Sequence, residues 1–338
     1  MKNFSQKTIL ISILLLASKA SFSQENDSIK LGVKKKVLSD FPFTRMFNLE
    51  YNYYGSTPFT SKIFDEDFQE GKLDNQKELK LAVNIPIYTT QKWNFTGSFN
   101  YRYNEFVYSD VENVSNQYIY QQEKYERNHT FITGLNATYF SRLFKKPFIY
   151  NLSVFADGSS ENGYERIKAL VGGSLVLKAD AKKTLAVGAV IIIDPTTQIP
   201  FFPTLSYDYR FLGTGYDLNV LLPQRILLRK KINEVSRVSI GSMLATSGFY
   251  VYNDNPWTPS VSEYSQLEIQ SGLIYERLMM KNFIVTLRGG VSSFVASRLT
   301  EKAKPVNEHY FSTDQKAKGY FNIGLSYHPN LSKKQDKE

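Results

Sequence analysis

The sequence contains no cysteine and, after its first residues, no apolar run long enough for a membrane helix. The absence of cysteine excludes disulfides, thiolate metal sites, a cysteine nucleophile and a lipidated N-terminal cysteine. The longest later apolar run, Leu185–Ile193, falls well short of the roughly 20 residues that a spanning helix needs. Histidine is scarce, with three residues. We therefore expect no metal and no cofactor.

The N-terminus has the features of an export signal. Lys2 and Lys7 flank the start of the chain, Ile9–Ala17 is apolar, and small residues follow up to Ser23. This order predicts a cleavable signal peptide over residues 1–23. Removal of its three lysines lowers the formal net charge from +9 to +6. The remaining basic residues form no long run, so nucleic acid is not an expected partner.

The main signal is an alternation of apolar and polar residues. Phe99 and Tyr101 share one parity of their segment, and Ser98 and Asn100 share the other. Successive strand residues point to opposite faces, so such a segment is apolar on one side and polar on the other. The pattern recurs along the chain in segments of roughly ten residues. With an export signal, it predicts an all-β fold, an antiparallel up-and-down transmembrane barrel.

Fourteen strands are predicted, with twelve as the fallback. Pro223–Gln224 interrupts the stretch Tyr216–Ile232, where proline would cost a ladder hydrogen bond, and a turn there gives an even number. The predicted strands are Phe47–Tyr54, Lys77–Tyr88, Trp93–Asn104, Thr130–Ser141, Phe148–Asp157, Ile167–Lys178, Leu185–Ile193, Pro203–Phe211, Tyr216–Leu222, Arg225–Ile232, Arg237–Tyr252, Tyr264–Glu276, Phe283–Val291 and Lys318–Tyr327.

The barrel is expected to occupy residues 43–328. Residues 24–42 form a short periplasmic segment, too short for a plug domain, and residues 329–338 form a hydrophilic tail. Short turns are expected on the periplasmic side. The long polar connections, expected as outer loops, are Gly55–Gln76, Glu105–Asn128, Asn253–Glu263 and Ser292–Ala317.

The last strand carries a further motif. Asn322, Gly324 and Tyr327 fit the pattern polar-x-Gly-x-x-aromatic, which resembles the signal that the barrel assembly machinery recognises. With the Ser-Phe-Ser-Gln stretch ending at Gln24 and the strand entry Pro203–Tyr207, the chain is similar to an uncharacterised family of outer-membrane β-barrel proteins of the Bacteroidota. This resemblance implies location in the cell outer membrane among its lipids and lipopolysaccharide, and no established chemistry.

The inward parity predicts a polar lumen of mixed charge. Strand registry places Arg210 near Asp217 and Glu78 near Arg102, within cross-strand reach. Such pairs either fill and rigidify the lumen or form a constriction that orients a small polar solute. A filter for one ion sign would instead favour one charge. The predicted lumen-lining residues are Glu50, Glu78, Lys80, Arg102, Lys168, Asp208, Arg210, Asp217, Glu268 and Arg288.

Three functions are compatible with these features. The first is a non-enzymatic barrel, either a narrow passive channel or a structural barrel. The second is a carrier of hydrophobic solutes, which resembles the fourteen-stranded fatty-acid transporters but lacks their longer N-terminal hatch. The third is an outer-membrane hydrolase that uses His129 or His309 on the outer connections, although no local motif supplies their partners.

Overall fold

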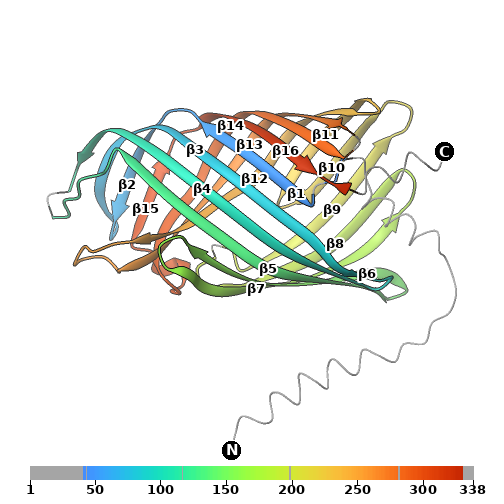
Figure 1. Ribbon diagram of the computed structural model, residues 1–338, viewed down its shortest axis with the longest axis horizontal. Coiled ribbons are helices and arrows are strands. Elements are labelled where there is room, and N and C mark those ends of the chain that lie inside the picture. The colour runs from blue at the N-terminus through green and yellow to red at the C-terminus, as the bar shows by residue number, and fades with distance from the viewer. Residues whose placement is uncertain (1–40, 43, 116, 198, 281, 330–338) are drawn as a thin grey trace, which may run out of the picture.

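The computed structural model describes residues 41–42, 44–115, 117–197, 199–280 and 282–329. The expected signal peptide, most of the expected periplasmic segment and all but the start of the C-terminal tail lie outside these residues. The described chain forms one antiparallel sheet that closes on itself (Figure 1). Among the described residues, no helix is long and apolar enough to cross a membrane.

The sheet consists of strand segments joined by connections of very different length, with one short 3₁₀ helix, η1, at Val306–Glu308. The segments are β1 Phe47–Tyr54, β2 Thr57–Ile63, β3 Glu66–Thr89, β4 Trp93–Asn113, β5 Tyr125–Leu143, β6 Lys146–Ser159, β7 Gly163–Ala179, β8 Lys183–Ile193, β9 Phe201–Phe211, β10 Tyr216–Leu222, β11 Arg225–Asn233, β12 Ser236–Tyr252, β13 Val261–Met279, β14 Phe283–Glu301, β15 Phe311–Gln315 and β16 Lys318–Tyr327.

The ring has fourteen places, as predicted, although the sheet has 16 segments. β2 continues β1 after a short break, and β15 leads into β16 in the same way. β1 pairs with β3 and β16, whereas β2 pairs with β3 and β15, so each broken strand fills one place. The breaks lie side by side, where the Gly55 N–H donates to the Gly319 carbonyl over 2.9 Å. The predicted turn at Pro223–Gln224 separates β10 from β11.

Side chains alternate across the wall as the sequence pattern predicts. On β1 the outward residues Phe47, Leu49 and Tyr51 are 41%, 45% and 37% exposed. On the neighbouring β16 the inward Asn322 is fully buried, at 0%. Large apolar groups therefore cover the outside and polar groups fill the inside, which is the reverse of a water-soluble protein and the arrangement of a membrane barrel.

The prediction of long loops was wrong for much of three of the four polar connections, where the strands extend instead, whereas in Asn253–Glu263 only residues 261–263 belong to a strand. β2 keeps the alternation, but its buried inward residues Phe59 and Ile63 are apolar and its exposed outward residues Thr60 and Lys62 are polar. A wall with a polar exterior stands in water. The hydrogen-bonded ladder of strands therefore continues beyond the membrane. The polar exterior of these extensions is the reason that the sequence pattern predicted loops there. The three regions concerned are Gly55–Gln76, Glu105–Asn128 and Ser292–Ala317.

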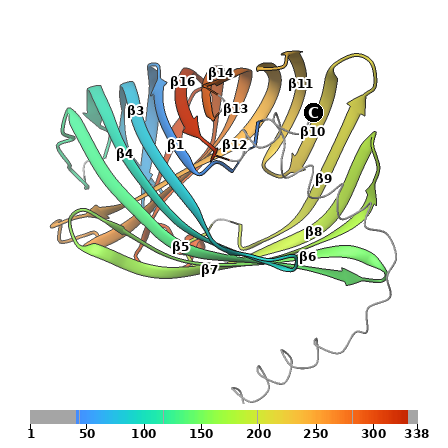
Figure 2. The same ribbon diagram turned by 45° about the vertical axis from the view of Figure 1, so that its right-hand side comes forward.

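The wall is tall on one side and low on the other. β3 and β4 have 24 and 21 residues, whereas β10 and β11 have 7 and 9. Figures 1 and 2 show the long strands running well past the ends of β8–β11. β11 pairs with β12 only as far as Arg225 opposite Met243. Beyond that point β12 keeps β13 as its ladder neighbour, up to Tyr252.

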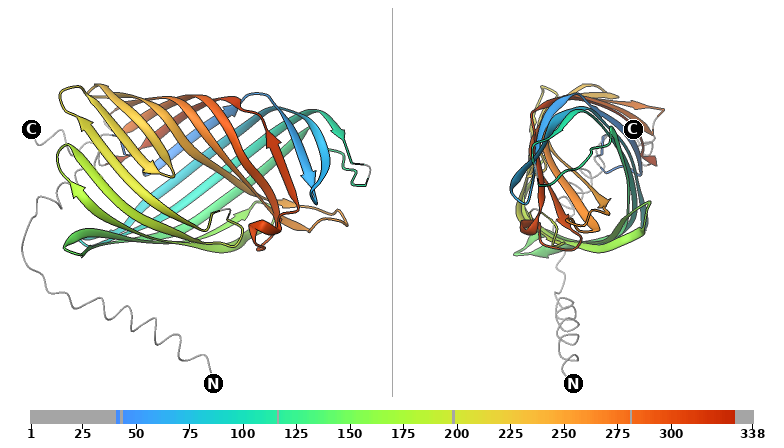
Figure 3. Two further views of the ribbon diagram at one scale, coloured as in Figure 1. Left: turned by 180° about the vertical axis from the view of Figure 1, so that it is seen from behind. Right: turned by 90° about the vertical axis from the view of Figure 1, so that its left-hand side faces the viewer.

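The outer half of β12 is covered on both faces. On one face Phe249 stacks on Tyr264, with ring centroids 4.6 Å apart, and meets Phe106 of β4 at 5.8 Å. On the other face the Tyr250 hydroxyl donates to Asp157 of β6 over 2.9 Å. The outer half of the barrel is therefore flattened around a small apolar core, and β12 divides this core from a polar layer beneath β6 and β7. The right-hand view of Figure 3 looks along the barrel.

Candidate functional site

The first ion-pair network lies at mid-height inside the barrel. Glu78 on β3 is 2% exposed and meets Lys80 at 2.8 Å and Arg102 of β4 at 3.1 Å. Asn52 of β1 donates to the same carboxylate over 3.0 Å. Arg102 also reaches across the barrel and donates to Ser247 of β12 over 3.3 Å. The predicted neighbours Glu78 and Arg102 therefore come together, and their contacts bridge the lumen.

A second carboxylate, Glu268 of β13, lies beside this network. It pairs with Lys318 of β16 at 3.3 Å and accepts a hydrogen bond from Ser292 over 3.0 Å. The Lys318 side chain is 1% exposed and also donates to Gln76 over 3.1 Å. Sequence reasoning missed Lys318 as a lumen residue. Its inward parity on the predicted last strand was the available signal.

Below these carboxylates, β1, β14 and β16 carry the next polar pairs. Glu50 and Arg288 meet at 3.3 Å. Asn322 donates to Glu50 over 3.4 Å. A Cβ on Gly324 would lie 3.3 Å from the Glu50 side chain, so glycine leaves room for that carboxylate. Tyr327 has the outward parity and packs on the rings of neighbouring strands. The part of Asn322, Gly324 and Tyr327 in assembly stays a prediction.

The described residues before β1 lie inside the end of the barrel at which the short turns are found. Arg45 is 8% exposed, pairs with Glu276 of β13, and donates to the Pro42 carbonyl over 3.0 Å. Arg237 of β12 donates from Nε to the same Glu276 carboxylate over 2.9 Å. Phe41 is buried, with the Arg237 guanidinium 4.8 Å from its ring. Two arginines on one carboxylate thus hold the chain inside the mouth.

A cavity of about 40 Å³ lies beside these arginines. That volume holds about three water molecules, since one water needs roughly 10–15 Å³ on the same measure. Its lining combines charged groups with an apolar side, so the space can hold water or a small polar group but not a long hydrocarbon chain. The lining residues are Arg45, Asn48, Glu50, Leu227, Arg237, Ser239, Met243, Ile274, Glu276 and Arg288.

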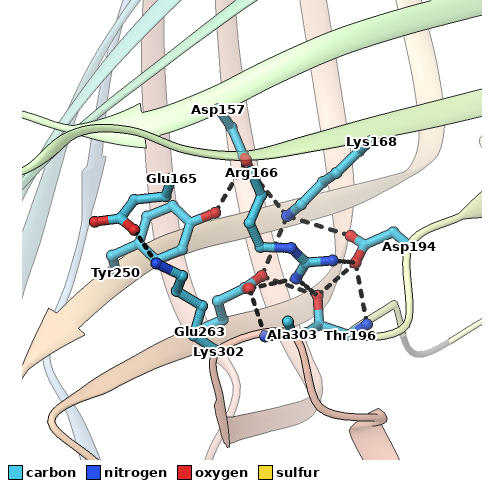
Figure 4. Close-up of polar contacts among 10 residues, drawn as sticks. All are labelled: Asp157, Glu165, Arg166, Lys168, Asp194, Thr196, Tyr250, Glu263, Lys302 and Ala303. Carbon is cyan, nitrogen blue, oxygen red and sulfur yellow. Dashed lines mark hydrogen bonds and ion pairs between the residues drawn. The ribbon is translucent and has the colours of Figure 1, made fainter.

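A third network closes the outer half and is drawn in Figure 4. Lys168 of β7 meets Asp157 at 2.7 Å and both Asp194 and Glu263 at 3.2 Å. Arg166, two residues earlier on the same strand, pairs with Asp194 at 2.7 Å and also with Glu263 of β13. Three carboxylates therefore surround two cations, and the contacts join β6, β7 and β13 across the interior.

The β8–β9 connection takes part in this network through Asp194 and Thr196. The Thr196 hydroxyl lies 2.8 Å from Asp194 and 2.9 Å from Glu263, two carboxylates that accept from it. Burial raises the pKa of Asp194, but the charge of Lys168 and the Thr196 hydrogen bonds outweigh it and hold that pKa below its ordinary value. Sequence reasoning found Lys168 alone, because its partners come from other strands and from a connection.

The short strands β9–β11 carry a smaller cluster. Asp208 accepts a hydrogen bond from Asn219 over 2.6 Å and meets Arg229 at 3.5 Å. Asp217 also pairs with Arg229, which lies opposite it on β11. Arg210 occupies the registry position opposite Asp217 on the other side, as predicted, but its side chain is exposed. Both neighbouring strands thus place an arginine opposite Asp217, and the ion pair is formed with Arg229.

The inner face of β5–β9 differs from these buried networks. Its middle part carries small, polar and half-buried side chains, whereas apolar inward residues such as Leu170, Ile192 and Phe202 lie nearer the outer end. Asn136, for example, donates to Asn151 over 3.0 Å and to Ser153 over 2.7 Å while remaining partly accessible. Water therefore reaches this inner wall. The small polar residues of this wall are Asn136, Thr138, Asn151, Ser153, Ser174, Thr204 and Ser206.

The histidines do not assemble a catalytic or metal site within the described residues. His129 lies on β5 with the outward parity, where Nδ1 is 2.7 Å from the Tyr101 hydroxyl. His309 follows η1 in an outer connection, and His328 follows β16 at the opposite end. The described chain contains no group of three histidine or acidic side chains arranged to hold a metal ion. The three histidines are thus dispersed over different parts of the barrel.

A closed antiparallel ring with an apolar exterior and a polar interior defines the class of outer-membrane β-barrels. The chain matches no protein-family model and no curated protein sequence. It is similar in structure to an outer-membrane channel from Pseudomonas putida F1, at 9% identity, a TM-score of 0.35, and coverage of 83% of this chain and 96% of the other.

A Pseudomonas aeruginosa FadL homologue gives 9% identity and a TM-score of 0.32, with coverage of 85% of this chain and 91% of the other. The outer-membrane protease OmpT from Escherichia coli gives 8% identity and a TM-score of 0.28, with coverage of 86% and 99%. Proteins with different activities thus show comparably low identity and structural similarity to this chain, and these similarities identify no substrate.

Proposed function

We propose that this barrel is a passive, non-enzymatic channel of the outer membrane for small polar solutes, and that the conformation described is closed. The observation that carries the proposal is the group of half-buried polar side chains on the inner wall of β5–β9. A barrel filled only for rigidity has no need of an accessible inner face. Small hydroxyl and amide groups there can exchange hydrogen bonds with a passing solute and with water.

The closures above and below this wall support a channel that can open. They are made by ion pairs around Glu263 in the outer half and Glu276 at the periplasmic mouth. Charged groups favour water once it is admitted, and replacing buried ion pairs by apolar groups is often neutral or stabilising. Closures made of ion pairs are therefore better suited to a pathway that fills with water when the channel opens than to a permanent plug.

Carriage of hydrophobic solutes fits the lumen less well. The apolar clusters in the outer half are occupied by the chain's own side chains, such as Phe68 and Leu299 in one and Leu73 and Phe249 in the other. The accessible inner wall combines amides and hydroxyls with apolar residues such as Leu170 and Phe202. A long acyl chain would have to displace this packing or lie against amides and hydroxyls, which costs free energy because their hydrogen bonds with water would be lost.

Single-channel recording in planar bilayers tests the proposal. We expect brief, rare openings from the unaltered chain and frequent openings from the double variant Glu263→Gln with Glu276→Gln. Glu105→Gln is the matched control, since Glu105 also joins two cations, Lys77 at 2.9 Å and Arg127 at 3.0 Å, but on the outward face. Silence of the double variant, with the fold retained by circular dichroism, would favour a filled structural barrel and contradict the channel.

Membership of the Bacteroidota barrel family, recognition of β16 by the barrel assembly machinery, and contact with lipopolysaccharide are part of the same proposal. They rest on the sequence motifs and on the exposed apolar exterior. Deletion of β16 or replacement of Tyr327 by aspartate should lower the amount of barrel in the membrane fraction. An unchanged amount would remove the assembly role of that strand.

A further inference from the structure

The geometry points to a binding surface for anionic phospholipid headgroups around the periplasmic end of the barrel. Five basic residues lie within the last few ladder positions of their strands at this end, on the outward face. We name them the basic belt. Its members are Lys146, Lys178, Lys183, Lys230 and Arg277.

The strand registry shows that these side chains leave the wall on the lipid side. Lys183 pairs with the outward Tyr209, and Lys230 pairs with the outward Tyr216. The Lys230 ammonium lies over the Tyr216 ring, 4.6 Å from its centroid. Lysine bodies of this kind lie along apolar surface and place their charge in the polar layer. The belt therefore points toward lipid headgroups rather than into the lumen.

An aromatic girdle fixes the height of the belt. Trp93 and Tyr139 meet at 4.4 Å, Tyr139 and Tyr150 at 6.0 Å, and Tyr209 and Phe211 at 4.9 Å, all on the outward face near the short turns. Aromatic residues of membrane barrels gather at the interface between hydrocarbon and headgroups. The belt lies at or just beyond this girdle, which is the level of lipid phosphates.

The charge at this end is one-sided. In the described turns and outward strand ends, the acidic residues are Asp180, 3.3 Å from Lys178, and Glu234, 2.9 Å from Lys231. The turn residues Lys145 and Lys182 add to the belt's positive charge. The opposite end differs, because the β2–β3 turn region carries Asp65, Glu66, Asp67 and Glu70. General solubility would not require such a separation of charge between the two ends.

An acidic protein or a lipid could each complement this charge, and the placement favours the lipid. The belt lies on the side of the cylinder, between the aromatic girdle and the turns, where a periplasmic protein would have to displace lipid to reach it. Phosphates of the periplasmic leaflet are already at that level. Each basic residue near an anionic membrane surface is worth about 1 kcal/mol, which corresponds to about a fivefold preference per contact.

The two tryptophans of the chain allow a direct test. Trp257 packs on Phe68 and Tyr118 near the outer end, so Trp257→Phe leaves Trp93, in the girdle, as the single reporter. The mature chain is folded into phosphatidylcholine vesicles that contain a minor fraction of phosphatidylglycerol. Bromine is placed on the acyl chains of either lipid, and quenching of Trp93 reports which lipid lies beside it.

We expect brominated phosphatidylglycerol to quench Trp93 several-fold more effectively than brominated phosphatidylcholine present at the same fraction. Molar salt should weaken the preference, because it screens exposed charges. Replacing the five belt residues by glutamine should remove it. Replacing the outer-end residues Lys62, Lys72 and Lys304 by glutamine should leave it unchanged. Equal quenching by both lipids at low salt, or a preference that survives loss of the belt, would overturn the inference.

Discussion

Glu276→Gln is the perturbation whose effect can be worked out most fully from the structure. The Glu276 side chain is 7% exposed and is shared by Arg45 and Arg237, whose side chains are 8% and 10% exposed. The substitution keeps the size of the side chain and removes its charge. Two nearly buried guanidinium groups then lose their common counter-charge, although Arg45 keeps its hydrogen bonds to Pro42 and Thr286.

Loss of one member of a buried ion pair typically costs about 3–5 kcal/mol, because the remaining charge stays buried and unpaired. We expect a loss of about this size for Glu276→Gln. The matched substitution Glu105→Gln breaks two pairs whose cations, Lys77 and Arg127, are 39% and 59% exposed. Solvent screens such pairs, so the expected loss is about 0–1 kcal/mol.

Urea unfolding in lipid vesicles, followed by Trp93 and Trp257 fluorescence, measures the difference. The double variant Glu276→Gln with Arg45→Met should recover part of the loss, since it removes one of the two uncompensated charges. If Glu276→Gln unfolds within about 1 kcal/mol of Glu105→Gln, the mouth is wetter or more mobile than the contacts indicate, and the argument for an ion-paired closure fails.

Two further predictions follow from the alternation and from the outer network. Leu152→Arg should lower assembly into membranes far more than Ser153→Arg, because Leu152 is outward and 47% exposed. A charge facing hydrocarbon costs about 2–4 kcal/mol near the midplane. Similar heat resistance of the two folded fractions on gels would contradict this. The interactions that lower the pKa of Asp194 stabilise the closure at pH values above the ordinary aspartate pKa of about 3.9. This stabilisation is lost as the pH falls through the lowered pKa. Channel openings should therefore increase only in strong acid, and Asp194→Asn, which should open more often at neutral pH, should remove that dependence; an increase beginning near neutral pH would count against the assignment.

The membrane-spanning part of the fold could be predicted because most strands there place apolar residues outward and many polar residues inward. This gave the fourteen places of the ring and the split at Pro223–Gln224. The rule reverses beyond the membrane. In β2 the buried residues include Phe59 and Ile63, and the outward residues Thr60 and Lys62 are polar. Polar outward residues do not fit the pattern of a membrane strand, so this segment was predicted to be a loop.

The candidate site was predictable only where its partners are neighbours in the sheet. Glu78 and Arg102 lie on adjacent strands, and registry alone brings them together. Lys168 reaches Glu263 on a strand far away around the ring, because the low wall of β8–β11 allows β12 and β13 to move inward. Arg45 lies before the first strand, where no alternation marks a side chain as inward. These contacts depend on the shape of the barrel.

The absence of native cysteine makes the inner wall open to a direct measurement. Single cysteines at positions 151, 152, 153 and 154 of β6 can be treated with a water-soluble, membrane-impermeant maleimide after folding into lipid vesicles. We predict slow labelling at 151 and 153, which face the inner wall and are reached when the channel opens, and protection at 152 and 154, which face hydrocarbon. Protection at all four positions would show a dry, filled interior, and equal labelling would contradict the barrel's assignment of faces.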